Sequence, residues 1–556
     1  MAFVKRYTRA DGSLIWKQRY EGGMNSSDDA YEAFRGLSMH YILGGAAELD
    51  RLHRRVWDGI TRQFTRYGQV YREFDSNWDW MHHGEGYTSF YPMGMADPED
   101  RRFRDRAVKF AAMYTGEDSE SPNYDPELKL MRAVMNGSRG PKMSWNTRDW
   151  IPTNANLTYY HLPFDDIPGV KTPVGWINDD QFAAIVETMS RRMARGDVPI
   201  NMTAAPLIAN AFLYTGEEKY RRWVAAYMGK WVELTKQNGG ITPDNVGLSG
   251  KIGEYMDGRW WGGYYGWKWP RGGMDVVRAA STGAKVAVLL SGDAKWLDLP
   301  RSQMEVLRRN TRLENGVPAV AMRHDQRGWH HYLPEPAGPY IELWYMSQDK
   351  ADWQHVERLA TAHRGKPETP ELGWVAFLHG KDPQYPERAF QRDLDQVSRK
   401  LRRILNEHGD PETWVDSHWS SLDPLPHDSL IRLTLGGLPV DLRGEMLHAR
   451  LRYFDAEQRR PGLPPGVAAL VTRLEAGMTE VELVNTDRLE HKALLVQGGA
   501  YGEHQILEVS SPAGSQPVNQ SFFRVELAPG SGATLRIAMK RFSNSPTYAF
   551  PWRREK

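Results

Sequence analysis

The segment Phe212-Leu-Tyr-Thr-Gly216-Glu-Glu-Lys-Tyr220 is the clearest copy of a pattern that the chain uses six times. Each copy joins an apolar helix end to an acidic residue and a second helix, usually through a Gly able to adopt the left-handed C-cap conformation. The other copies begin at Tyr41, Met113, Leu289, Trp344 and Phe377. Helix, tight turn and helix, recurring at intervals of roughly 30 to 100 residues, predict a set of helical hairpins. The uneven spacing favours a closed α/α toroid over a regular solenoid.

Two textures divide the chain. Apolar spacing near 3.6 residues predicts helices over 29–57, 101–114, 180–195, 203–236, 275–290, 297–310, 337–362 and 387–406. From residue 428 onward, alternation predicts short antiparallel strands over 430–435, 447–454, 479–484, 493–496, 522–527 and 533–539. We therefore expect an α+β multidomain chain: an (α/α)6-type helical-hairpin toroid over 1–386, a helix and linker over 387–427, and an antiparallel β-sandwich over 428–556.

Composition excludes several classes of protein. The 71 Lys and Arg almost balance the 70 Asp and Glu, which argues against nucleic acid or an anionic membrane as partner. Cysteine is absent, so disulfides, thiolate metal sites and a Cys nucleophile are excluded together. No Gly-x-Gly-x-x-Gly, phosphate-loop or Gly-x-Ser-x-Gly motif is present, which argues against nucleotide cofactors and serine hydrolase chemistry. The 21 Trp and 25 Tyr favour a carbohydrate ligand, because aromatic rings stack on sugars.

The N-terminal sequence lacks the apolar run of a signal peptide, and no segment is long enough to cross a bilayer. The expected location is therefore cytoplasmic, or periplasmic or secreted if a signal peptide has been removed.

The short turns of the hairpins mark one end of the predicted toroid, so the loops that enter the hairpins lie at the other end. These loops are unusually rich in polar and aromatic residues, and functional residues concentrate on loops held by a rigid scaffold. They cover 24–29, 78–87, 175–180, 253–267 and 323–332. Their convergence predicts a site on one face of the molecule.

The 253–267 loop combines five glycines with aromatic, acidic and basic side chains. Planar Arg259 is suited to holding a carboxylate or sulfate, and aromatic rings offer platforms for sugars. The candidates are Glu254, Asp257, Arg259, Trp260, Trp261, Tyr264, Tyr265 and Trp267. The alternative is a well-packed loop with an internal Asp257–Arg259 pair.

The 78–87 loop contributes Trp80, His82, His83, Glu85 and Tyr87. Histidine is the usual general acid or base near neutral pH and also the commonest metal ligand. The spacing does not match a zincin helix, so no metal site is predicted here. A structural histidine bonded to the backbone is the alternative for one of the adjacent pair.

Two further loops supply candidates. His330, His331 and Tyr332 place imidazoles beside a phenol, a pairing able to move a proton to and from carbon; the alternative is a half-buried polar strand or turn. Asn178 and Asp179 precede a helix, where N-capping is the leading explanation and a catalytic carboxylate is the alternative.

Helical hairpins followed by an antiparallel β domain resemble the toroid-plus-β-sandwich polysaccharide lyases and the six-hairpin glycosidase superfamily. The lyase resemblance implies that Tyr and His act on the C5 proton of a uronic acid while Asn, Arg or Glu neutralises its carboxylate. The matching types here are Tyr264 or Tyr265, His82 or His83, His330 or His331, Arg259 and Asn178. The glycosidase resemblance implies a carboxylate pair drawn from Glu85, Asp179, Glu254 and Asp257.

The sequence analysis favours β-elimination of an acidic oligo- or polysaccharide, with glycoside hydrolysis as the alternative and a non-catalytic glycan-binding protein as the second alternative. No cofactor is expected, and the oligomeric state is left open.

Overall fold

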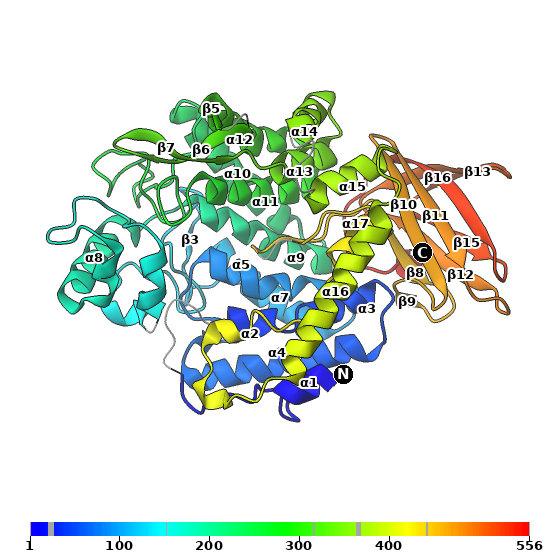
Figure 1. Cartoon of the computed structure of the whole chain (residues 1–556), viewed down its shortest axis with the longest axis horizontal. Helices are drawn as coiled ribbons and strands as arrows, with labels where there is room; N and C mark the ends of the chain where they lie inside the picture. The colour runs from blue at the N-terminus through cyan, green and yellow to red at the C-terminus, as the bar shows by residue number, and fades with distance from the viewer. Residues whose placement is uncertain are drawn as a thin grey trace.

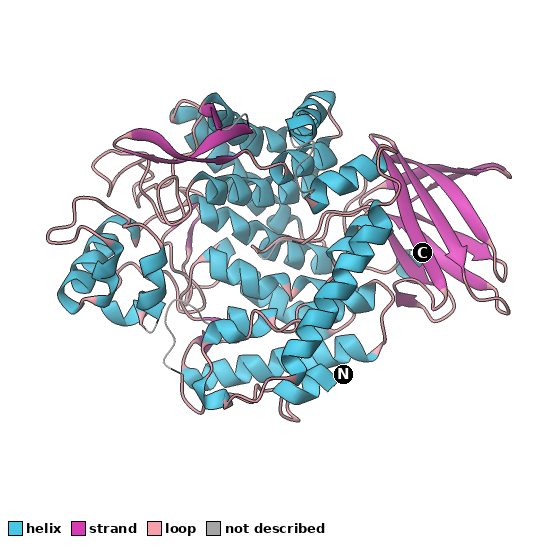
Figure 2. Cartoon of the chain, in the orientation of Figure 1, coloured by secondary structure: helices cyan, strands magenta, loops and turns pink. Residues whose placement is uncertain are grey.

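The computed structural model describes residues 2–20, 27–151, 153–314, 317–362, 369–440 and 443–554. Helices fill most of the molecule, and the C-terminal strands form a separate region at one end (Figures 1 and 2). Within the described residues, no helix combines the length and apolarity needed to cross a membrane. The predicted mixture of a helical part and C-terminal sheets is confirmed.

Five of the six sequence copies join two helices that pack against each other. The pairs are α3 (Gly36–Ile42) with α4 (Glu48–Tyr67), α9 (Ala205–Thr215) with α10 (Glu218–Gln237), α11 (Gly273–Ser291) with α12 (Asp298–Arg309), α13 (Gly338–Ser347) with α14 (Lys350–Ala362), and α15 (Pro370–Leu378) with α16 (Tyr385–Leu405). Gly216 and Gly292 cap α9 and α11 with φ of 70° and 72°, the left-handed conformation that glycine adopts without strain. The helical hairpins are therefore confirmed, while their closure into a ring stays a prediction.

The copy at Met113 differs. It ends α7 (Arg101–Thr115) at Gly116, as predicted, but the chain continues into β3 (Tyr124–Asp125) and β4 (Leu130–Met131) instead of a helix. The remaining helices are α1 (Ala2–Tyr7), α2 (Asp28–Glu32), α5 (Trp80–Thr88), α6 (Tyr91–Ala96), α8 (Asp179–Met193), α17 (Asp428–Leu435) and α18 (Pro551–Arg554).

The prediction of a strand over 430–435 is wrong, because these residues form α17. The segment Leu430-Ile-Arg-Leu-Thr-Leu fits helical spacing as well as strand alternation when it is read alone. Gly436 ends the helix in the left-handed conformation, with φ of 57°. The sheets therefore begin only at β8.

Two antiparallel sheets form the C-terminal region. The five-stranded sheet has the order β10-β11-β16-β13-β14, and the four-stranded sheet has the order β15-β12-β8-β9. Leu494 and Val496 of β12 and Val481 and Leu483 of β11 belong to one apolar core, which holds the two sheets against each other. The strands are β8 (Leu451–Asp455), β9 (Arg460–Pro461), β10 (Val467–Glu475), β11 (Met478–Asn485), β12 (Lys492–Gly498), β13 (Gln505–Ser511), β14 (Gly514–Gln520), β15 (Phe522–Leu527) and β16 (Gly532–Lys540).

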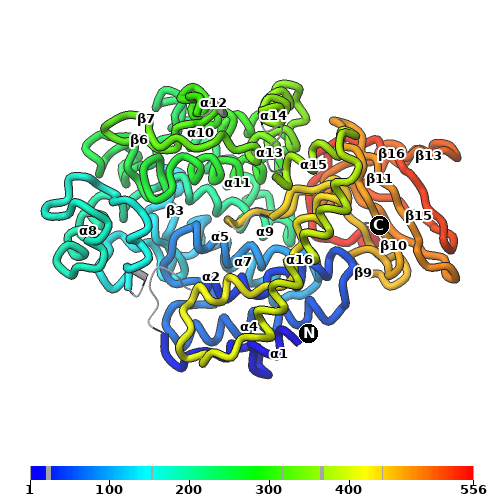
Figure 3. Tube along the Cα trace, in the orientation of Figure 1, coloured from blue at the N-terminus to red at the C-terminus, as the bar shows by residue number. Residues whose placement is uncertain are grey.

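The helical part also contains three small antiparallel sheets among the described residues. A hairpin pairs β1 (Val70–Tyr71) with β2 (Phe74–Asp75), and a second pairs β3 with β4. A three-stranded sheet joins β5 (Thr311–Glu314), β6 (Val317–Asp325) and β7 (Gly328–Pro334). The tube in Figure 3 shows this sheet and α8 on the side of the molecule away from the C-terminal sheets.

The segment between α17 and β8 runs through the helical part. Gly444 donates its backbone N–H to the hydroxyl of Thr88 of α5 at 3.0 Å. Glu445 forms an ion pair with Lys285 of α11, with its carboxylate oxygen 2.5 Å from Nζ. A Cβ added to Gly84 would lie 2.7 Å from the backbone of Arg443, so α5 needs glycine at this crossing. The connection to the sheets thereby forms part of the interior next to α5.

Candidate active site

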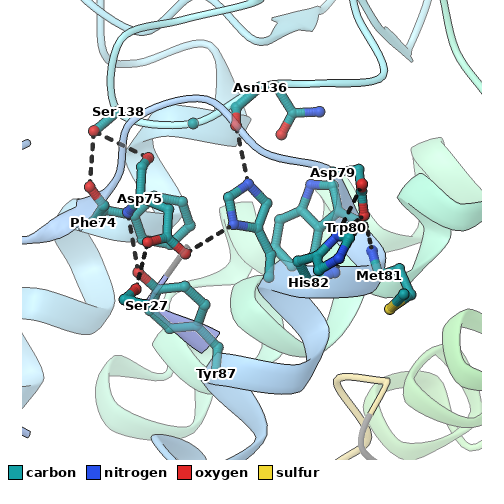
Figure 4. Close-up of polar contacts among 12 residues, drawn as sticks. Ser27, Phe74, Asp75, Asp79, Trp80, Met81, His82, Tyr87, Asn136 and Ser138 are labelled. Carbon is teal, nitrogen blue, oxygen red and sulfur yellow. Dashed lines mark hydrogen bonds and ion pairs between the residues drawn. The ribbon is translucent and has the colours of Figure 1, made fainter. Parts of the chain in front are cut away.

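The site is organised by Asp79, which begins α5. Its carboxylate accepts the backbone N–H groups of Met81 and His82 at 2.9 and 3.2 Å, the usual role of an N-cap residue. The same carboxylate lies 2.9 Å from Nδ1 of His82 (Figure 4). Because a carboxylate only accepts, Nδ1 carries the proton, and Nε2 is the ring nitrogen left for other partners. The helix start therefore fixes the orientation of His82.

Tyr264 reaches the same carboxylate from a distant loop. Its phenol donates to Oδ2 of Asp79 at 2.9 Å, and both residues are buried. His82 and Tyr264 are among the alternative His and Tyr candidates of the sequence analysis, and the structure links these two through Asp79.

The loop that carries Tyr264 is folded around Asp244. This fully buried carboxylate accepts the backbone N–H groups of Gly262, Gly263 and Trp267 at 3.0, 2.7 and 2.8 Å. A Cβ on Gly263 would lie 1.9 Å from the carbonyl oxygen of Asp244. The glycines of the 253–267 loop thus allow the backbone to wrap a carboxylate of the chain itself.

A buried acidic cluster lies between α2 and α5. Asp28, Asp29 and Glu32 come from α2, and Glu85 lies one helical turn after His82 on α5. Asp28, Asp29, Glu32 and His82 are at most 8% exposed, while Glu85 is half-buried. Glu85 is therefore the carboxyl group of this set that is most open to an incoming molecule.

Close packing of the two helices forces the cluster together. A Cβ on Gly86 of α5 would lie only 3.3 Å from the Cα of Asp28. Burial raises the pKa of Glu85 well above its ordinary range, and the negative charge of Glu32 adds to the shift. Burial and Asp29 likewise raise the pKa of Glu32 to about 8. Glu32 thus holds its proton near neutral pH, and the pKa of Glu85 is shifted in the same direction.

The pKa values of Asp79 and His82, at the start of α5, are shifted so that both groups are charged. Burial alone would lower the pKa of His82, but the adjacent Asp79 carboxylate raises it to about 9. Burial alone would raise the pKa of Asp79, but the charge and hydrogen bonds of His82 bring it below the ordinary value. The site therefore combines an imidazolium–carboxylate pair with two glutamates whose pKa values are raised.

Three of these groups have a geometry suited to a cation. Asp28, His82 and Glu85 each offer a ligand atom, and these atoms lie within 4.8 Å of one another. Carboxylate oxygens suit hard cations and imidazole suits transition metals. The expectation of no metal stays a prediction.

Basic groups border the acidic cluster on the side of α11. Arg271 pairs with Asp275 at 3.3 Å and lies 5.3 Å from the ring centre of Tyr265, a predicted site residue. Arg443, from the segment that precedes the sheets, lies 3.5 Å from Asp275. The ring of Tyr265 packs edge-on against Tyr264, with ring centres 4.8 Å apart, so it lies next to the phenol that is bonded to Asp79.

Three site residues predicted in the 78–87 loop, His83, Tyr87 and Trp80, are packed in the interior of the protein. The loop itself is helix α5, so that prediction of irregular structure is wrong: Gly84 and Gly86 lower its helical propensity but serve close helix packing. His83 is buried between Asp75 at 3.4 Å and the carbonyl of Asn136 at 2.9 Å, which fits the alternative of a structural histidine. Tyr87 stacks on Phe74, and Trp80 is fully buried.

The aromatic residues of the 253–267 loop divide into two groups. Trp267 is fully buried and donates its indole N–H to Thr242, so neither face is open to a sugar. Trp260 and Trp261 are half-buried and contact the ring of His324, with centroids 4.7 and 5.6 Å apart. They remain available as an aromatic surface.

The charged residues of the same loop lie apart from the acidic cluster. Arg259 pairs with Asp257 at 3.3 Å and lies over the ring of Trp261, as in the packed-loop alternative. Glu254 is exposed and accepts from the backbone and hydroxyl of Ser249 at 2.9 and 2.6 Å.

The other two predicted groups also lie on separate elements. His330, His331 and Tyr332 belong to β7, where His330 faces Asp325 at 3.6 Å and Tyr332 stacks under Arg312. Asn178 caps α8 by accepting from Gln181 at 3.1 Å, and Asp179 lies exposed in the first turn. Of the predicted loop 24–29, residues 24–26 lie outside the described residues.

Sequence reasoning missed four acidic members of the site. Asp79 was passed over between two tryptophans, although an Asp three residues before a His at a helix start is a capping signal. Asp28 and Asp29 lie at the start of the helix predicted from residue 29, where N-capping is the leading interpretation, and Glu32 lies inside that predicted helix. The three- and four-residue spacing from Asp29 and Asp28 to Glu32 is the signal that places these side chains on one face of a helix.

A family model described as "Domain of unknown function (DUF8034)" matches residues 1–319 and 308–431. No curated protein matches the chain. Two solved structures of endoglucanase CelQ from Clostridium thermocellum were found by structural comparison. The complex with cellotriose has a TM-score of 0.22 and 12% identity, and covers 65% of this chain and 74% of that chain. The complex with cellobiose and cellotriose has a TM-score of 0.26 and 10% identity, and the match covers 94% of this chain and 86% of that chain. At these TM-scores, function has to be argued from the residues of the chain itself.

Proposed function

The chain belongs to the DUF8034 family, and we propose that it is a glycoside hydrolase that cleaves a neutral oligo- or polysaccharide with carboxyl groups of the α2–α5 cluster. The observation that carries the proposal is Glu85: a half-buried carboxyl group, with its pKa raised well above the ordinary value by burial, next to the buried carboxyl group of Asp28. Glycosidases need this combination of an acid with a raised pKa and a second carboxyl group.

Glu85 acts as the acid that protonates the leaving glycosidic oxygen. Asp28 acts as the nucleophile: its carboxylate forms a bond to the anomeric carbon as the glycosidic bond breaks. Glu85, now ionised, takes a proton from water, and the water oxygen displaces Asp28 to release the sugar. Oxygen atoms of the two carboxyl groups lie within 4.8 Å, which favours this retaining mechanism over an inverting one that needs room for water.

The same surroundings weigh against β-elimination. His82 is held as an imidazolium by Asp79, so it is not available as a base at neutral pH. Arg259, expected to neutralise a uronate, is paired with Asp257 on a different part of the loop. A cluster of four carboxyl groups also disfavours an anionic substrate. These features support a neutral glycan and the hydrolytic alternative.

Half-buried Trp260 and Trp261 support a sugar as the substrate. They lie a few residues before Tyr264 in the same loop, and the phenol of Tyr264 is held by its hydrogen bond to Asp79. Their half-buried aromatic faces offer stacking surfaces for sugar units on the loop that also carries Tyr264.

The test is a panel of neutral and uronic-acid glycans, with new reducing ends and the ultraviolet absorbance of unsaturated sugars recorded together. Reducing ends from a neutral glycan without absorbance support the proposal. Growth of both signals on a uronic-acid glycan would mean elimination and would overturn it. Absence of both signals on every glycan, with binding by calorimetry, would favour the glycan-binding alternative.

A further inference from the structure

Helix α16 carries an apolar surface that the described chain leaves uncovered. Of the fifteen exposed large apolar side chains in the described residues, Phe390, Leu394, Leu401 and Leu405 lie on this one helix. Their exposed fractions are 37%, 60%, 41% and 68%, and half-buried Val397 lies between them. Such a concentration marks an interaction surface, whereas single exposed apolar residues are ordinary.

The apolar side chains are spaced as in a coiled coil. The steps from Phe390 to Leu394, Val397 and Leu401 are four, three and four residues, which is the alternation that keeps one seam facing a partner helix. At about 100° of rotation per residue, this seam lies roughly a third of a turn from the face that contains Tyr385, Ala389 and Ile404. Those three residues are buried against the rest of the chain. The helix therefore has one apolar face for its own fold and a second one for another helix.

The charges beside the seam identify the partner. Glu387 lies near the start of α16 and Arg402 near its end, both exposed, on the flank of the seam away from the rest of the chain. When a second α16 is laid antiparallel, Glu387 of each copy meets Arg402 of the other, and Phe390 meets Leu401. Leu394 then lies close to the two-fold axis. A parallel arrangement would instead place each charge beside its own kind.

We propose that the chain forms a two-fold symmetric dimer through antiparallel contact of the α16 helices, with Leu394 at the centre. The contact is isologous, so each ion pair occurs twice. The helix crosses the outside of the helical part in Figure 1, where a second molecule can approach it. The dimer does not depend on the proposed glycosidase activity.

The test uses the full-length chain in sedimentation equilibrium, with light scattering as a second measurement. The wild type is expected to be a dimer at micromolar concentration. Leu394→Glu is expected to raise the dimer dissociation constant at least about tenfold, because two buried carboxylates meet at the axis. Leu489→Glu is the matched control: this side chain is 89% exposed, on a loop of the sheet region, and its substitution should leave the dimer unchanged.

A charge exchange tests the antiparallel register. Glu387→Arg and Arg402→Glu should each weaken the dimer, and the double variant should restore the wild-type dissociation constant. Circular dichroism and thermal unfolding check that every variant is folded. A monomeric wild type would overturn the proposal, whether or not it binds anionic lipid vesicles through α16. So would failure of the double variant to recover.

Discussion

Nδ1 of His82 lies 2.9 Å from both carboxylate oxygens of Asp79, the residue that caps the same helix. A buried imidazole would ordinarily lose its proton, but this carboxylate keeps it charged. The acidic cluster of α2 and α5 thereby contains one positive charge, which partly offsets the effect of burial and of neighbouring carboxylates in raising the pKa values of Glu32 and Glu85.

Substitution Glu85→Gln is expected to lower kcat by about 10²- to 10⁴-fold, since it removes the proposed acid. Wild-type kcat should also fall on the alkaline side, because the raised pKa of Glu85 means that the active protonated form is lost as pH rises through it. Glu254→Gln serves as the control, since that carboxylate is exposed and bonded to Ser249. Equal losses in the two variants would refute the role of Glu85.

Substitution Asp28→Ala should abolish hydrolysis but allow partial rescue by azide or formate, which can replace a carboxylate nucleophile. With the wild type, proton NMR of the first product should show the same anomeric configuration as the substrate. An inverted product would exclude Asp28 as nucleophile and favour a base that activates water.

The stability of the protein should fall between pH 6.5 and about 9 through His82. The folded pKa of His82 lies above its unfolded value, so its contribution is complete below pH 6.5 and is lost as pH rises through about 9. The contribution is at most about 3 kcal/mol. Urea unfolding of Asp79→Asn across this range should show a weaker decline; an unchanged decline would assign it to other groups.

The stability of the protein should also decline through Glu32, over a lower range of pH. Its folded pKa of about 8 exceeds the ordinary 4.5, so stability is complete below 4.5 and is lost as pH rises towards 8. Glu32→Gln, which keeps the shape without the charge, should raise the free energy of unfolding at pH 8 relative to wild type by at least about 1 kcal/mol. Equal stability of the two proteins at pH 8 would contradict this expectation.

Removal of divalent cations by a chelator should leave activity and melting temperature unchanged, because the raised pKa values of Glu32 and Glu85 favour their neutral forms, which bind cations weakly. Calcium or manganese is then added back to the chelated protein, and activity is measured again. Loss of activity that either ion restores would mean that Asp28, His82 and Glu85 hold a cation. The acid role of Glu85 would then have to be withdrawn.

The sequence by itself determined the helical hairpins and most strands, because their signals are local. Gly216 and Gly292 mark helix ends by their backbone freedom, and the alternation over 479–484 marks a strand without reference to any neighbour. It also nominated His82, Glu85 and Tyr264 by residue type alone.

Tertiary structure alone decided how these residues meet. Gly84 and Gly86 make α5 resemble a loop in sequence, and they become intelligible only when Arg443 and Asp28 pack against them. Tyr264 meets Asp79 across 185 positions of the chain, a distance over which no local pattern carries information. The burial that raises the pKa of Glu85 belongs to the contact between α2 and α5, and no single segment could reveal it.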